Sequence, residues 1–174
     1  YNQKNLGLKS RALAKTILYA VLYGASARRV HEILDCSMQE AKEVLERFYK
    51  VLPFLYEIKG DIICKLEDHG YIRALDKRIL TIRSQHSSLN ALIQSCGAII
   101  MKKALTILWD NLKNKDAFVV ANIHDEFQIE SRPEIADEVG KIAVNSIIQA
   151  GEHFKLRVPL GAEYRVGKNW AETH

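Results

Sequence analysis

Residues 11–24 read RALAKTILYAVLYG, and this stretch decides the interpretation of the whole chain. Four of its side chains recur at spacings of four residues: Arg11, Lys15, Tyr19 and Tyr23. Four residues advance an α-helix by about 400°, so these side chains form one ridge on a predicted helix. At about 1.5 Å per residue, the ridge is about 18 Å long. Apolar residues occupy another side of the same helix, which favours its packing on a core.

The ridge combines two cations, two aromatic rings and a terminal glycine, Gly24. Guanidinium and ammonium groups bind phosphates, and a tyrosine ring stacks on a base or packs against a sugar. A glycine lets the backbone come close to a ligand. The ridge is therefore predicted to hold a nucleoside triphosphate. The alternative is an amphipathic helix whose long polar side chains only extend into solvent.

The hydrophobic pattern outside this stretch predicts an α+β fold in which helix dominates. Ser37 with Glu40 three residues later predicts a helix cap, and Pro53 predicts the start of another helix. Helices are predicted at about residues 9–24, 28–34, 37–52, 53–70, 87–111 and 133–151. A hairpin is predicted at residues 71–83 with its turn near Asp76, two strands at 117–131, and a last strand from Arg157 to Tyr164.

A second polar pattern lies on the long apolar helix, at His86, Asn90 and Gln94. Donor and acceptor side chains on a largely buried helix need hydrogen-bond partners. The minor groove of a duplex offers acceptors at every base pair, so a stripe of this kind can read a duplex almost independently of sequence. Arg83 precedes the stripe and is a candidate for a backbone phosphate. A polar network within the core, or an exposed polar stripe, remains the alternative.

A third pattern, His124-Asp125-Glu126, falls at the predicted turn between two strands. Adjacent carboxylates are costly unless a cation or solvent relieves their repulsion. One or two carboxylates together with substrate phosphates commonly bind Mg²⁺ in phosphoryl transfer. A two-metal site would need a further carboxylate from elsewhere. The alternative is an exposed polar turn.

Composition and charge are compatible with a folded, polyanion-binding chain. Hydrophobic residues make up 48% of its 174 residues and charged residues 26%, which argues against wholesale disorder. Residues 1–31 carry six basic residues and no acidic one, although a net charge of +4 overall also fits solvated helix faces. The three widely spaced cysteines predict reduced thiols in a cytosol-like compartment, and the apolar runs predict no membrane helix.

Taken in order, the three patterns resemble family A DNA polymerases, the DNA polymerase I group. The ridge up to Gly24 resembles the nucleotide-binding helix of the fingers, and His124-Asp125-Glu126 resembles the palm hairpin that bears a catalytic aspartate. The resemblance covers essentially the whole chain. LDKRILTIRSQHSSLNALIQSCGA at residues 75–98 and KNWAETH at 168–174 resemble the phage replicative branch.

The resemblance implies an incomplete right-hand fold with a fingers subdomain at residues 1–70 and part of the palm at 71–174. The implied nucleotide-binding residues are Arg11, Lys15 and Tyr19, with Lys15 also the general acid that protonates the pyrophosphate leaving group. Asp125 is the implied Mg²⁺ ligand, and Glu126 supports the metal site less directly. The implied DNA contacts are Tyr23 and Gly24 at the templating position, His124 near the primer terminus, and Arg83, His86, Asn90 and Gln94 along the duplex.

Tyr19 carries a further implication of the resemblance. Family members with tyrosine at this place accept 2′,3′-dideoxynucleotides, whereas those with phenylalanine discriminate against them. The physical reason is that the tyrosine hydroxyl substitutes for the missing 3′-OH in a polar contact near the triphosphate. His86 stands where other branches of the family often have arginine.

The resemblance also implies that the active site is shared with a region outside this chain. The family's second metal-binding aspartate precedes the nucleotide-binding helix, and residues 1–31 contain no acidic residue. We therefore expect the chain alone to be inactive. We expect Mg²⁺, dNTP and primer-template DNA to bind at an active site that a second polypeptide or an upstream region completes. That partner would carry the thumb, the first palm motif and possibly an exonuclease. The expected compartment is the bacterial cytoplasm, with the gene carried by a phage.

Two other functions stay open at this point. One is a non-catalytic primer-template DNA-binding module derived from a polymerase; Lys15 and Asp125 argue against it, because duplex binding alone requires neither residue. The other is a relative of RNA polymerases or reverse transcriptases, since sugar selection rests mainly on the missing motif. The sequence does not distinguish a natural split from a truncated chain, nor does it reveal the host, the processivity factor, proofreading or fidelity.

Overall fold

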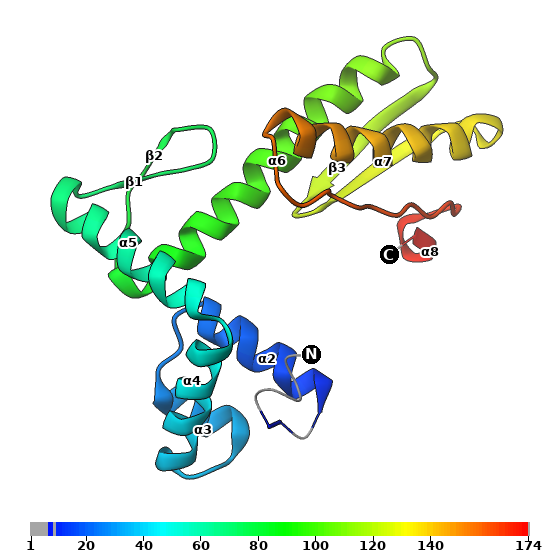
Figure 1. The fold of residues 1–174 in the computed structure, drawn as a ribbon. Helices are drawn as coiled ribbons and strands as arrows, with labels where there is room; N and C mark the ends of the chain where they lie inside the picture. The colour runs from blue at the N-terminus through cyan, green and yellow to red at the C-terminus, as the bar shows by residue number, and fades with distance from the viewer. Residues whose placement is uncertain (1–6, 9, 174) are drawn as a thin grey trace. The chain divides into compact units, whose positions relative to one another are not determined.

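The computed structural model describes residues 7–8 and 10–173, so Lys4, Lys9 and His174 lie outside the described residues. Contacts divide the chain into two compact units, Tyr1–Gln94 and Ser95–His174. Figure 1 shows the helices of the first unit in blue to green and the hairpin and helices of the second in green to red. The predicted limits of a fingers part at 1–70 and a palm part at 71–174 remain a prediction.

Four helices dominate the first unit: α2 (Arg11–Leu22), α3 (Ala27–Leu34), α4 (Met38–Val51) and α5 (Pro53–His69). Their shared core contains Ile17, Val30 and Phe48, none of which exposes any side-chain surface. Burying one such side chain contributes about 1.5–3 kcal/mol, so this cluster fixes how the helices face one another. The predicted helices in this region are confirmed, although α2 ends at Leu22 and does not extend to residue 24.

The helix ends are where the sequence signals placed them. At α4, Ser37 Oγ accepts a hydrogen bond from the Glu40 backbone N–H at 3.2 Å. In return, Glu40 Oε2 accepts one from the Ser37 backbone N–H at 2.8 Å, which completes a capping box. Pro53 begins α5, and Gly70, at a φ of 74°, ends it in the left-handed conformation that glycine adopts without strain.

A short hairpin follows, formed by β1 (Ile72–Arg73) and β2 (Ile79–Leu80), as predicted for residues 71–83. Its turn is held by the Asp76 carboxylate, which accepts a hydrogen bond from Arg78 Nε at 2.7 Å. The hydrogen bond from Arg78 lowers the pKa of Asp76. A lowered carboxylate pKa means that this contribution to stability is present at neutral pH and is lost as the pH falls through the folded-state pKa.

The long apolar segment begins as a 3₁₀ turn, η1 (Gln85–Ser87), and continues as α6 (Ser88–Leu112). His86 therefore lies on the 3₁₀ turn and not on the α-helix with Asn90 and Gln94, which corrects the predicted helical spacing of the three. The side chain of Ser88 explains the transition, because its hydroxyl donates to the Gln85 carbonyl at 2.6 Å and is fully buried.

The sequence analysis predicted no membrane helix, and one described segment meets the test for a candidate span on length and composition. Gln85–Leu112 contains an 18-residue window with a mean hydropathy of 1.4. One helix of this kind is weak evidence, because the core helix of a soluble protein passes the same test.

The second unit is built on an antiparallel hairpin of β3 (Ala117–Ile123) and β4 (Glu126–Ser131). A 3₁₀ turn, η2 (Pro133–Ile135), leads into α7 (Ala136–His153), so the helix predicted from Pro133 starts three residues later. Leu108, Leu112, Ala117 and Val139 form the buried cluster between these elements. The chain closes with a single helical turn, α8 (Trp170–Thr173).

The predicted last strand at Arg157–Tyr164 is wrong. These residues form neither helix nor strand, and within the described chain the only partner of β3 is β4. Their alternating side chains pack on helix α7 instead of a sheet. A Cβ at Gly151 would lie 2.9 Å from Leu160 Cγ, and one at Gly140 would overlap the Tyr164 ring. Two glycines thus provide notches for an extended segment, and alternation alone does not separate this arrangement from a strand.

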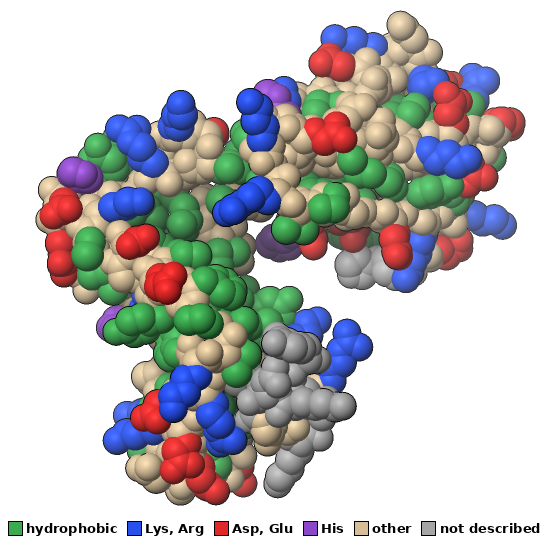
Figure 2. Space-filling view, in the orientation of Figure 1, with side chains coloured by type: hydrophobic (Ala, Val, Ile, Leu, Met, Phe, Trp, Pro, Cys, Tyr) green, Lys and Arg blue, Asp and Glu red, His purple; other side chains and the backbone are tan. Residues whose placement is uncertain are grey.

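The fold is α+β with helix dominant, as predicted, and contains two separate two-stranded sheets in the described residues. Figure 2 shows basic and acidic side chains interspersed on the visible face, with apolar side chains between them. Because basic and acidic side chains nearly cancel, the net charge is small. A polyanion would therefore bind at a limited patch of basic residues and not over a whole face.

The cap of α4 can be tested against a neighbouring helix start. Ser37→Ala removes the hydroxyl that accepts from the Glu40 N–H, and we expect the free energy of unfolding to fall by about 1 kcal/mol. Chemical denaturation of the two proteins measures this difference.

Ser26→Ala is the matched control, because Ser26 begins α3 without a side-chain capping hydrogen bond. We expect it to cost clearly less than Ser37→Ala. Equal losses in the two variants would show that the capping box does not stabilise the fold.

Candidate functional site

Helix α2 presents the predicted ridge to the outside. Arg11, Lys15, Tyr19 and Tyr23 are all exposed, while Ala14, Ile17 and Val21 of the same segment are buried. Ser10 Oγ accepts a hydrogen bond from the Leu13 N–H at 3.1 Å and fixes where the helix begins. The buried apolar side thus sets the rotation of the helix, and that rotation exposes the ridge.

The ridge side chains lie against one another in sequence order. Lys15 Nζ lies 5.7 Å from the centroid of the Tyr19 ring, within the range of a cation–π contact. The centroids of Tyr19 and Tyr23 are 6.3 Å apart with the rings tilted by 40°. A cation followed by two adjoining rings gives one continuous polar and aromatic surface.

Tyr23 and Gly24 connect this ridge to the second polar pattern within the same unit. The Gln94 side-chain amide donates a hydrogen bond to the Tyr23 hydroxyl at 3.4 Å. Gly24 has a φ of 85°, and a Cβ there would overlap the backbone carbonyl oxygen of His86. The end of α2 therefore lies directly against the start of the η1–α6 segment, and only glycine permits both the backbone conformation and the close approach.

The polar pattern on η1 and α6 is only partly satisfied. His86 and Gln94 are exposed, and Asn90 is half-buried. The side-chain oxygen Oδ1 of Asn90 is buried without a hydrogen-bond partner among the described residues. A buried polar atom left unpaired costs about 1–3 kcal/mol. This amide therefore calls for a hydrogen-bond partner from outside the described protein atoms. Arg83 is exposed just ahead of the pattern.

The third pattern forms the tip of the β3–β4 hairpin. Ile123 pairs with Glu126, which leaves His124 and Asp125 as the two-residue turn. His124 has a φ of 53°, in the left-handed region that non-glycine residues seldom adopt, and both turn side chains are exposed. The hairpin thus holds an exposed carboxylate at the end of two paired strands.

Glu126 is not part of a free polar turn. Its Oε1 accepts hydrogen bonds from the side-chain amide of Gln128 and, at 3.1 Å, from the indole N–H of Trp170. The sequence analysis did not identify Gln128 or Trp170 as site residues. The only sign of this contact in the sequence is that the indole N–H of Trp170 needs an acceptor. Trp170 lies 44 residues from Glu126, so the sequence does not indicate which acceptor it finds.

The metal-binding capacity of the described residues is limited. They contain no group of three or more His, Cys, Asp or Glu side chains able to hold a metal ion. Asp125 supplies a hard oxygen ligand of the kind that Mg²⁺ prefers, and Glu126 is already engaged by two donors. One exposed carboxylate of this kind could supply only one ligand of a magnesium site.

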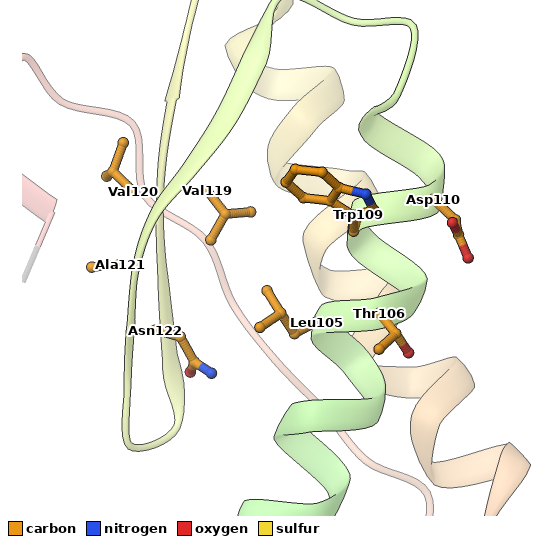
Figure 3. A pocket seen from close by; sticks show the side chains of 8 residues that line it. All are labelled: Leu105, Thr106, Trp109, Asp110, Val119, Val120, Ala121 and Asn122. Carbon is orange, nitrogen blue, oxygen red and sulfur yellow. The ribbon is translucent and has the colours of Figure 1, made fainter.

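Beside the hairpin, an open and mostly apolar groove of about 620 Å³ lies between α6 and β3. Figure 3 shows Trp109 and Leu105 on the helix facing Val119 on the strand. Trp109 and Val120 line this groove and are 62% and 60% exposed. Large exposed apolar side chains along a groove mark an interaction surface more often than free surface.

The site residues fall into two sets by compact unit. The ridge, Gly24, Arg83 and the polar pattern up to Gln94 belong to the first unit, and His124, Asp125 and Glu126 belong to the second. Contacts bring together the ridge and the polar pattern through Tyr23 and Gly24.

Comparison with known proteins identifies the family. The sequence profile of DNA polymerase family A matches residues 2–172, nearly the whole chain. The chain belongs to DNA polymerase family A. The predicted resemblance is thereby confirmed, including its link to phage enzymes.

Individual relatives agree with this assignment. The chain is 32% identical to a DNA-directed DNA polymerase of Enterobacteria phage T3 and 30% identical to that of Escherichia phage T7, over 99% of its own length in each case. It is 30% identical to a thermostable DNA polymerase I of Thermus filiformis over 95% of its length. The chain spans only 28%, 28% and 21% of these three relatives.

A solved structure supports the fold. The chain is similar to the "POL domain of Pol1 from M. smegmatis complex with DNA primer-template and dNTP", with a TM-score of 0.75 and 22% identity. The match covers 80% of this chain and 27% of that one. The helix-dominant fold is thus that of part of a family A polymerase domain.

The close approach at Gly24 yields a test of the contact between ridge and polar pattern. In Gly24→Ala, the positive φ costs about 1–2 kcal/mol, and the new methyl group meets the His86 carbonyl. We expect a loss of at least that size in the free energy of unfolding, measured by chemical denaturation.

Gly60→Ala is the control and has the opposite expected sign. Gly60 lies within α5, and a Cβ there meets nothing within 4 Å. Alanine at this place should stabilise the protein by about 0.5–1 kcal/mol. A neutral Gly24→Ala would contradict the contact with His86.

Proposed function

We propose that this chain supplies the nucleotide-binding helix, the minor-groove contacts and one metal-binding aspartate of a template-directed DNA polymerase. The observation that carries the proposal is the exposed ridge of α2, whose cations and rings adjoin one another and end at the contact between Gly24 and His86. Family membership gives the reaction class, DNA-directed DNA synthesis.

At the ridge, Arg11 and Lys15 bind the triphosphate of the incoming nucleotide, and Tyr19 packs against its sugar and base. Both cations are exposed at the amino-terminal part of α2, where no acidic side chain lies in the first turn. Helix N-termini themselves favour anions. Lys15 donates its proton to the pyrophosphate that leaves, as general acid.

The polar pattern contacts the primer-template duplex. Tyr23 and Gly24 lie at the templating position, and Asn90, Gln94 and His86 face the minor groove, with Arg83 on a backbone phosphate. The side-chain amide of Gln94 supports this role, because it is exposed and carries N–H donors, which the minor-groove acceptors need. Amide and imidazole groups read the nearly uniform minor-groove acceptors, which suits an enzyme that copies any sequence.

At the hairpin tip, Asp125 would hold Mg²⁺ together with an aspartate from outside this chain, and His124 lies near the primer terminus. When bound, a pair of such ions stabilises the attacking and leaving oxygens of phosphoryl transfer. Glu126 supports the hairpin through its hydrogen bonds and does not complete the metal site alone.

A second polypeptide or an upstream region completes the enzyme, with the thumb, the first palm motif and possibly an exonuclease. The groove of Trp109 and the exposed Phe118 and Val120 support a covering partner on the second unit. The proposed setting is the bacterial cytoplasm and a phage-encoded gene, as for the phage relatives.

Primer extension tests the proposed function. With Mg²⁺ and dNTPs, we expect extension only when the completing polypeptide or region is present, and none with the chain alone. Lys15→Ala should lower the rate by about 10²–10⁴-fold, the usual contribution of general acid catalysis, and Asp125→Asn should abolish extension.

Lys42→Ala and Glu134→Gln serve as controls, because both residues are exposed and lie outside the proposed site. Extension by the chain alone would contradict the shared active site. DNA binding without extension in any combination, with only slightly weaker binding in Lys15→Ala, would instead establish a non-catalytic DNA-binding module.

Tyr19 gives a separate prediction about substrate choice. We expect the assembled enzyme to incorporate dideoxynucleotides well, and Tyr19→Phe to lower the ratio of dideoxy to deoxy incorporation. The hydroxyl lost in this variant is the group proposed to replace the missing 3′-OH.

Competition between the two substrate types in single-nucleotide incorporation measures that ratio. Tyr56→Phe is the matched control, because Tyr56 is exposed on α5 outside the proposed site. A ratio that is low in the unsubstituted enzyme and unchanged in Tyr19→Phe would disprove this role of Tyr19.

A further inference from the structure

The carboxyl-terminal turn α8 is joined to strand β4 by side-chain hydrogen bonds. Trp170 Nε1 donates to Glu126 Oε1 at 3.1 Å. The Thr173 hydroxyl lies 3.3 Å from Gln128 Oε1 and 3.1 Å from the Trp170 carbonyl oxygen, so these two acceptors share its one proton. The Gln128 amide in turn donates to the same Glu126 oxygen. The four side chains thus form one hydrogen-bonded network.

The spacing of these residues is what allows the network. Glu126 and Gln128 are two residues apart on β4 and point to the same face of the hairpin. Trp170 and Thr173 are three residues apart on one helical turn and share its face. Two side chains from each element therefore meet as two pairs.

Local hydrogen bonds stabilise the carboxyl-terminal segment from Lys168 to Thr173, called the tail below. A helix of only four residues needs such contacts, because isolated helical turns are unstable in water. Glu172 accepts hydrogen bonds from the Lys168 backbone N–H at 2.8 Å and from Asn169 Nδ2 at 3.1 Å. Asn169 Oδ1 accepts one from the Glu172 N–H at 3.3 Å, in the manner of an N-cap. These contacts hold the turn in the form that directs Trp170 and Thr173 toward β4.

Glu126 links this tail to the hairpin tip. It is the residue directly after Asp125, and its pairing with Ile123 closes the two-residue turn. We propose that Trp170 and Thr173 are positioning residues, which hold the carboxylate of Glu126 and through it the His124-Asp125 turn. This inference rests on the proposed role of that turn. In it, Glu126 holds the turn in place.

The inference has a structural test that does not depend on catalysis. The side-chain N–H of Trp170 in the full chain can be followed by ¹H–¹⁵N NMR, with Trp109→Phe assigning the two indole signals. In Glu126→Gln we expect the Trp170 signal to shift, because the amide oxygen that replaces the carboxylate is a weaker acceptor for the indole N–H.

Glu163→Gln is the matched control, since Glu163 is an exposed carboxylate of the same carboxyl-terminal segment. It should leave the Trp170 signal at its position in the unsubstituted chain. A Trp170 signal at the same position in the unsubstituted chain and in Glu126→Gln would overturn the proposed contact.

The second test concerns the assembled polymerase. Trp170→Phe keeps the ring and removes the donor, and Thr173→Val keeps the shape and removes the hydroxyl. We expect each to lower kcat by about tenfold, the order expected from the loss of one hydrogen bond to a charged or coupled group, with the KM for dNTP unchanged. Thr173→Ser, which retains the hydroxyl, should restore kcat.

Combining Trp170→Phe with Glu126→Gln should lower kcat no further than Glu126→Gln alone, because both changes remove the same interaction. Ala171→Ser, at an exposed place on the same turn, is the control for damage to the tail. Wild-type kcat in both Trp170→Phe and Thr173→Val would overturn the positioning role. If the unsubstituted assembly does not extend primers, the proposed function and the positioning role fail together, whereas the indole signal in Glu126→Gln still decides the contact itself.

Discussion

The burial of one side of α2 is the constraint on which the first unit depends. Ile17 exposes no surface and packs with Val30 and Phe48, so α2 has one allowed rotation about its axis. That rotation exposes every residue spaced by four from Arg11, and it brings Gly24 against the His86 carbonyl. The core therefore determines the position of the ridge, although no core residue belongs to the proposed site.

The second unit depends on a different kind of constraint. Its hairpin has two strands, and two-stranded sheets are stable only when something packs against them. Helix α7 and the cluster around Leu108 and Val139 support one face. The tail adds hydrogen bonds near the tip, where Trp170 and Thr173 hold Glu126 and Gln128. The apolar side chains around Trp109 are left uncovered by the described residues of this unit.

The distribution of charge follows from the same arrangement. Arg11 and Lys15 lie on a helix whose first turn contains no acidic residue, so their field is not neutralised by near neighbours on that helix. Some basic residues elsewhere are paired locally, as Arg78 is with Asp76 and Arg29 with Glu32. Surface pairs of this kind add little stability and offset positive charge only where they occur.

Much of this protein was determined by the sequence alone. The helix caps at Ser37 and Gly70, the hairpin around His124 and the ridge from Arg11 to Tyr23 are local, because each depends on residues within a few positions of one another. Family membership likewise followed from the order of short motifs. Only the tertiary structure decided that residues 157–164 pack into glycine notches on α7, that His86 belongs to a 3₁₀ turn, and that Trp170 reaches Glu126. These features depend on contacts between residues that are distant in the chain, or on a buried hydroxyl such as that of Ser88, and the periodicity of a single segment contains no information about either.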